Sequence, residues 1–115
     1  MARQDKTPLI GSTTSQAATA QASHADGHMF DNTSGDVNVI LENGTGSSAN
    51  VTFVTTKTVD GLAVADKVVA VAAGASVLVG RFAAGTYNQQ SGADEDKVYV
   101  DFGTVDPLIT ATYIR

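Results

Sequence analysis

Short blocks of alternating β-branched and polar residues dominate the chain from residue 36 to residue 115. Valine, isoleucine and threonine make up about a third of this stretch. Alternation with a period of two is typical of strands that bury one face. The blocks predict strands at residues 37–41, 51–56, 69–71, 77–79, 98–102 and 108–114.

Turn signals separate these blocks at spacings of roughly ten residues. The spacing predicts an all-β fold, a single small antiparallel β-sandwich or barrel. Gly74, between the valine pairs of 69–71 and 77–79, predicts a hairpin. Residues 62–70 are alanine-rich enough for a helix, but their flanking glycines and rising valine content favour a loop followed by a strand.

Residues 1–35 differ from the rest because residues 11–23 contain no large apolar side chain. Such a stretch buries too little surface to offset the entropy lost on ordering. We therefore expect an extended N-terminal arm (1–35), mobile alone and ordered on a partner, before a β-domain (36–115). The candidate partner-binding anchors are four large apolar side chains of this arm: Leu9, Ile10, Met29 and Phe30. For Met29 and Phe30, the alternative is a place in the domain core.

Composition excludes several classes of function. The chain of 115 residues has no cysteine, which excludes disulfides and thiolate metal sites, and its net charge of −5 argues against binding to nucleic acid. It has no apolar run long enough to cross a membrane and no N-terminal apolar block typical of a secretory signal. We expect a soluble protein without a cofactor.

Candidate catalytic and metal-binding groups are sparse. His24, Asp26, His28 and Asp31 resemble a set of metal ligands, but Gly27 weakens the helix that would bring the two imidazoles together. The run from Asp94 to Asp96 lacks the other ligands of a calcium loop and is expected to be a solvated tip. No nucleophile and base stand in a recognisable motif, so we expect no enzyme and no metal.

The stretch from Val51 to the C-terminus resembles the short β-rich head decoration proteins (capsid cement or minor capsid proteins) of tailed bacteriophages. The likeness rests on residues 58–64, 71–75, 79–82 with 85–88, and 98–102. Prolines are common in the family where this chain has Ala72 and Ala83. The resemblance implies a virion protein that coats the outer surface of an assembled capsid, contacts the major capsid protein and stabilises the shell.

This resemblance sets the expected function and location. We expect a homo-oligomer, with a trimer favoured, that lies in the host cytoplasm before assembly. The alternatives are a head-fibre, tail or connector component, and a module that binds carbohydrate through exposed aromatic side chains such as Tyr87 and Tyr113.

Overall fold

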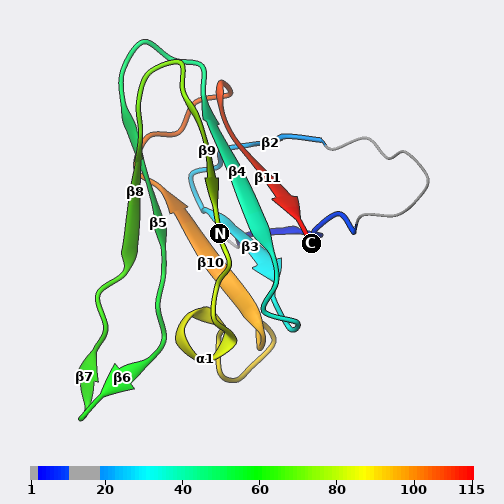
Figure 1. The fold of residues 1–115 in the computed structure, drawn as a ribbon, viewed down its shortest axis with the longest axis vertical. Coiled ribbons are helices and arrows are strands. Elements are labelled where there is room, and N and C mark those ends of the chain that lie inside the picture. The colour runs from blue at the N-terminus through cyan, green and yellow to red at the C-terminus, as the bar shows by residue number, and fades with distance from the viewer. Residues whose placement is uncertain (1–2, 11–18) are drawn as a thin grey trace.

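Two β-sheets face each other in the computed structural model, which describes residues 3–10 and 19–115 (Figure 1). The five-stranded sheet has the order β1 (Gln4–Lys6), β3 (His28–Asp31), β10 (Lys97–Phe102), β5 (Ala49–Phe53) and β8 (Lys67–Val71). The four-stranded sheet has the order β2 (Gln21–Ala22), β11 (Ile109–Ile114), β4 (Asn38–Asn43) and β9 (Ser76–Val79). A separate hairpin of β6 (Thr58–Val59) and β7 (Leu62–Ala63) and a single-turn helix, α1 (Ala84–Tyr87), complete the fold. The predicted all-β sandwich is confirmed.

The core lies between the two sheets and follows the predicted alternation. On β4, Val39 and Leu41 are buried while Glu42 is exposed, and on β5 Val51 and Phe53 are buried. Aromatic rings connect the layers, since Phe82 lies within contact distance of both Phe30 and Phe53. The buried cluster comprises Phe30, Val37, Val39, Leu41, Val51, Phe53, Val71, Val79, Phe82, Val98, Val100, Ala111 and Tyr113.

The hairpin predicted at Gly74 is wrong. β8 pairs with β5 in one sheet and β9 pairs with β4 in the other, so the turn at residues 72–75 carries the chain from sheet to sheet. Asn43 directs this crossing, because its N–H donates to the carbonyl of Ala75 at 3.0 Å and its carbonyl accepts from Gly74 at 2.7 Å. The strand predicted after a loop in residues 62–70, in place of a helix, is confirmed by β8, while the part predicted as a loop begins with the two-residue strand β7.

The boundary placed after residue 35 needs correction for the described residues. β3 lies between β1 and β10, with Phe30 directly opposite Val98, and β2 pairs with β11. The parts of residues 1–35 that the structure describes therefore contribute three strands to the sandwich, β1, β2 and β3. They escaped the prediction because they are short and their apolar residues do not recur at a regular spacing.

Two buried asparagines hold the segment that follows β9. The Asn32 amide nitrogen donates to the Phe82 carbonyl and to the Asn88 side-chain oxygen, each at 2.8 Å. The Asn88 amide nitrogen donates back to the Asn32 carbonyl at 3.0 Å. This reciprocal pair positions Phe82, which is part of the core although it lies outside any strand. None of the described helices is long and apolar enough to cross a membrane.

Candidate docking surface

The β6–β7 hairpin, called the finger here (residues 57–64), projects from the body beyond the ends of β5 and β8 (Figure 1). Its turn consists of Asp60 and Gly61, whose φ angles of 52° and 79° both lie in the left-handed region. Two such residues form the tight turn whose twist matches a pair of antiparallel strands. The turn places Val59 directly opposite Leu62.

Hydrogen bonds at the base fix the finger to the sandwich. The Val64 N–H donates to the Lys57 carbonyl at 3.1 Å, and the Thr55 hydroxyl donates to the Val64 carbonyl at 2.6 Å. The Thr55 N–H donates to the Asp66 carboxylate at 2.9 Å. The neighbouring Thr56 donates its N–H to the Thr86 carbonyl of α1 at 2.7 Å. The finger therefore has a defined orientation although it adds nothing to the core.

Exposed apolar side chains occur on the finger and on two edge strands. Val59 and Leu62 are 54% and 73% exposed, and Val68 on β8 and Leu78 on β9 are 58% and 70% exposed. β8 and β9 are free edges of their respective sheets. We call the finger together with β8 and β9 the open flank. Val68 and Leu78 lie on the outer faces of opposite sheets, whereas Val59 and Leu62 lie directly opposite each other on the finger and present an apolar pair to solvent.

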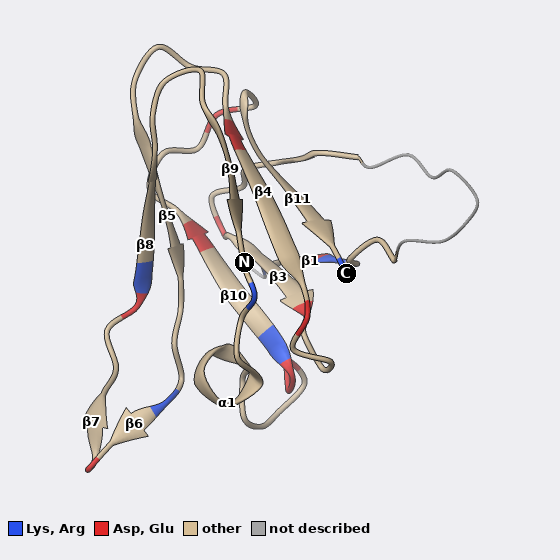
Figure 2. Ribbon diagram, viewed as in Figure 1, with Lys and Arg blue, Asp and Glu red and all other residues tan. Residues whose placement is uncertain are grey.

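The open flank also differs from the rest of the molecule in charge. Residues 57–93 carry a net charge of +1, whereas the remaining residues carry −6, and no acidic residue occurs between Asp66 and Asp94. The basic residues of this stretch are Lys57, Lys67 and Arg81, and Figure 2 shows blue segments next to β6, at the start of β8 and after β9. None of the three forms an ion pair with a described residue, while Arg3, Lys97 and Arg115 pair with carboxylates elsewhere.

The structure separates the four predicted anchors. Phe30 is fully buried in the core, and Met29 is half-buried on β3, so for Phe30 the alternative of a core position holds. Leu9 is half-buried and bridges to Ile114 in a parallel register, with its N–H donating to the Tyr113 carbonyl at 2.9 Å. Only Ile10 is exposed. The four residues do not form one surface, and the anchor role assigned to Phe30 is wrong because its ring is needed between the sheets.

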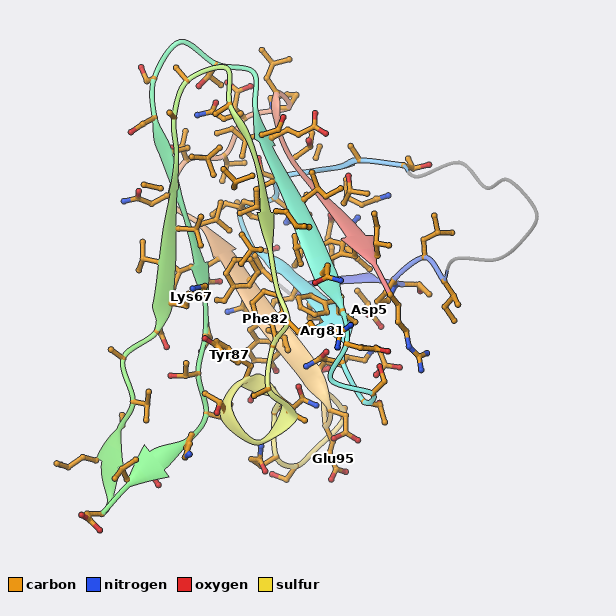
Figure 3. The ribbon with its side chains drawn as sticks, in the orientation of Figure 1. Asp5, Lys67, Arg81, Phe82, Tyr87 and Glu95 are labelled. Atoms are coloured by element: carbon orange, nitrogen blue, oxygen red, sulfur yellow. The ribbon has the colours of Figure 1, made fainter. Side chains whose placement is uncertain are left out.

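Two of the tyrosines considered for carbohydrate binding point into the protein. Tyr113 is buried, and its hydroxyl lies 2.7 Å from Nδ1 of His28. The Tyr87 ring packs edge-on against Phe82, with the ring centres 5.3 Å apart; Figure 3 shows both residues beside α1. A sugar-binding platform needs exposed ring faces. Tyr113, which was predicted to be exposed, is a core residue.

Two of the polar residues singled out as possible ligands, His28 and Asp94, have structural partners, whereas Oδ2 of Asp26 is buried without a hydrogen bond to a described residue. His28 is buried, and its Nε2 lies 2.9 Å from the Ala22 carbonyl oxygen. The Asp94 carboxylate accepts from the Tyr99 hydroxyl at 2.5 Å. Within residues 3–10 and 19–115, no three His, Asp or Glu side chains gather closely enough to hold a metal ion. The Asp60–Gly61 turn was visible in the sequence, but its spacing did not indicate that the turn would project.

The chain matches no family model, no curated protein and no solved structure.

Proposed function

We propose that this chain is a structural protein of a bacteriophage virion, which binds the lattice of the major capsid protein on the outer surface of the head and stabilises it. It acts as a symmetric oligomer and without catalysis. The resemblance of residues 51–115 to head decoration proteins supports this proposal. The observation that carries it is the finger, which exposes Val59 and Leu62 on a backbone held by hydrogen bonds at its base.

A finger of this kind suits attachment to a large protein surface. Because its backbone is ordered before binding, association costs little conformational entropy. Apolar side chains that enter a pocket and lose contact with water are the usual centres of binding energy in interfaces. Lys57 and Lys67, close to the finger in sequence, would add attraction to an acidic lattice. Several copies arranged on a repeating lattice bind tightly even when each contact is weak.

The interior polar groups support a role other than catalysis. His28, Tyr113, Asn32 and Asn88 are the groups that could perform chemistry or position a substrate, and they are buried. Their hydrogen bonds run to one another or to the backbone and join strands and loops of the fold. A catalytic group needs access to a substrate within hydrogen-bond reach.

Co-sedimentation of the full-length chain with capsids that lack it tests the proposal. We expect saturable binding at a copy number that matches the symmetry of the lattice. The double substitution of Val59 and Leu62 by serine should weaken binding at least about tenfold. Leu108→Ser is the matched control, because Leu108 is also exposed but lies outside the open flank.

Absence of binding to such capsids by the folded wild-type chain would overturn the capsid role. Equal loss of binding in the finger variant and in the Leu108 control would show that the finger is not the contact. Labelling of the protein on intact particles distinguishes the head from a head fibre, tail or connector, and label confined to the tail would contradict decoration.

A further inference from the structure

β9 forms a free edge of the four-stranded sheet, and its backbone register shows which groups face outward. Asn43 donates to the Ala75 carbonyl, and the ladder continues with Leu41 opposite Val77 and Val39 opposite Val79. In an antiparallel ladder, residues bonded to one neighbour alternate with residues whose N–H and C=O point to the other side. The N–H and C=O groups of Ser76 and Leu78 therefore point out of the sheet.

This edge is only four residues long, but it lacks the charge and the proline that protect many free strands. Residues 76–79 contain no charge and no proline, whereas β8, the free edge of the other sheet, begins with Lys67. Natural edge strands are usually protected by a charge, a proline or a bulge. Leu78 is 70% exposed on the outer face, directly beside Ile40 of β4. β9 is thus an apolar strand with unpaired hydrogen-bonding groups.

We propose that β9 pairs antiparallel with β9 of a second copy of this chain, about a two-fold axis at Leu78. Directly opposite residues in a ladder point to the same face of the sheet. The core-facing sides of the two copies therefore form one continuous face in two registers, with Leu78 opposite Leu78 of the second copy or with Val77 opposite Val77. In the register with Val77 opposite Val77, Leu78 of one copy lies opposite Ser76 of the other. The apolar Leu78 side chain then lies towards the charged Glu42, which pairs with Ser76 in the sheet. The first register joins Ile40 and Leu78 of both copies in one apolar row.

Charge complementarity supports the Leu78 register. It sets Ser76 of one copy opposite Gly80 of the other, and Arg81 follows Gly80 directly. Glu42 of the first copy lies on β4 beside Ser76, so it faces the segment that carries Arg81 of the second copy. Neither side chain has an ion pair with a described residue. The two-fold symmetry repeats the contact, so the dimer contains two pairs of Glu42 with Arg81.

The charge distribution favours a second copy as the partner. Two chains of net charge −5 repel each other, but residues 67–93 contain no carboxylate side chain, and β9 lies within this stretch. Figure 3 shows Lys67 and Arg81, the two charged residues of that stretch. Interfaces that are small and bury few side chains are weak, so we expect dimerisation in the micromolar range or above. The pairing can be tested on the purified chain without capsids.

A cysteine substitution tests the register, because the chain has no cysteine of its own. In the Leu78→Cys variant the two thiols meet at the two-fold axis, where opposite Cα atoms in a hydrogen-bonded pair are about 5.5 Å apart, within the range of a disulfide. We expect oxidation to give a covalent dimer at least about tenfold faster than in Leu108→Cys, the matched exposed control. Equal rates in the two variants would overturn the pairing.

Sedimentation equilibrium of the full chain, from about 1 µM to about 1 mM, tests the stoichiometry and the charge pair. We expect a monomer–dimer equilibrium that Glu42→Arg and Arg81→Glu each weaken about tenfold and that the double variant restores. A wild-type chain that stays monomeric over this range, or that forms a trimer, would contradict the two-fold pairing. A dimer that none of these substitutions affects would place the contact elsewhere, and binding of a different protein to β9 in its place would also overturn the proposal.

Discussion

The hydroxyl oxygen of Tyr113 on β11 and the Nδ1 atom of His28 on β3 lie 2.7 Å apart, and their hydrogen bond joins the two sheets across the core. Nε2 of the same imidazole donates to the Ala22 carbonyl at 2.9 Å, so in the neutral ring Nδ1 accepts from the tyrosine. Burial lowers the pKa of His28 to about 4, with smaller contributions from Lys6 and His24. Burial also raises the pKa of Tyr113 well above its ordinary value.

This arrangement predicts that acid weakens the fold. The unfolded chain takes up a proton on His28 near pH 6.5, whereas the folded protein resists protonation until about pH 4. As the pH falls from 6.5 to 4, the free energy of unfolding should therefore decrease by roughly 2–3 kcal/mol. Above pH 6.5, His28 is neutral in both states and causes no such loss. Urea unfolding at a series of pH values measures this loss.

Two variants assign the acid effect to the buried imidazole. His28→Gln should flatten the dependence between pH 6.5 and pH 4, and His24→Gln should retain it. Tyr113→Phe leaves Nδ1 without a donor and should lower the free energy of unfolding at pH 7 by about 1–2 kcal/mol. The same slope in wild type and His28→Gln would contradict the assignment.

Phe30 should matter for stability and Ile10 should not. Phe30→Ala leaves a cavity between the sheets and is expected to cost about 3–5 kcal/mol of the free energy of unfolding. Ile10→Ser removes an exposed side chain and should change it by no more than about 0.5 kcal/mol. Chemical denaturation compares the two. Equal effects would mean that Phe30 belongs to a detached arm, as the sequence suggested.

The strand that carries Phe30, β3, also shows how much of the fold could be predicted from the sequence. Alternation located β4, β5 and β10 because strands with one buried face carry a period of two, although the prediction of 51–56 for β5 is shifted from the strand at Ala49–Phe53. β1 and β3 lack such a signal, since Gln4–Lys6 is wholly polar and His28–Asp31 is only four residues long. Their place in the sheet depends on β10, which is remote in the sequence. Local composition does not contain that information.

The open flank was less accessible to prediction than the strands. Asp60–Gly61 indicated a tight turn, but a turn signal does not show whether its hairpin packs on the core or projects. Likewise, the glycine at position 74 indicated a reversal of the chain without indicating that the reversal changes sheets. Which strand edges remain free follows from the complete strand order alone.

The asparagine pair should contribute to stability through hydrogen bonds that have no replacement. Asn88→Ala removes one acceptor and one donor, and it leaves one N–H of the buried Asn32 amide unpaired. We expect a loss of about 2–3 kcal/mol in the free energy of unfolding. Asn50→Ala is the control, because Asn50 is exposed on β5. A loss in Asn88→Ala no larger than in this control would contradict a structural role for the pair.

The finger should open locally without unfolding the protein. Asp60→Val places a β-branched residue at a φ of 52° and should cost about 1–3 kcal/mol in the turn. Amide exchange at Val64, whose N–H bonds to Lys57, should then accelerate while the melting temperature stays nearly constant. Asp60→Gly tolerates this φ angle and serves as the control. A fall in melting temperature equal to that of a core variant would show that the finger is not independent of the sandwich.

Residues near the start of the described chain pair with strands near its end, through Leu9 and through β2 and β3. The Leu9 N–H donates to Tyr113, and the last residue, Arg115, donates its N–H to the Leu9 carbonyl at 2.7 Å. β2 lies along β11, and β3 lies along β10. The sheets therefore close only once β11 is available to pair with β2 and β4, and this closure is slowed by the long loops that separate these strands in the sequence. Without β11, the four-stranded sheet would lose the strand that joins β2 to β4.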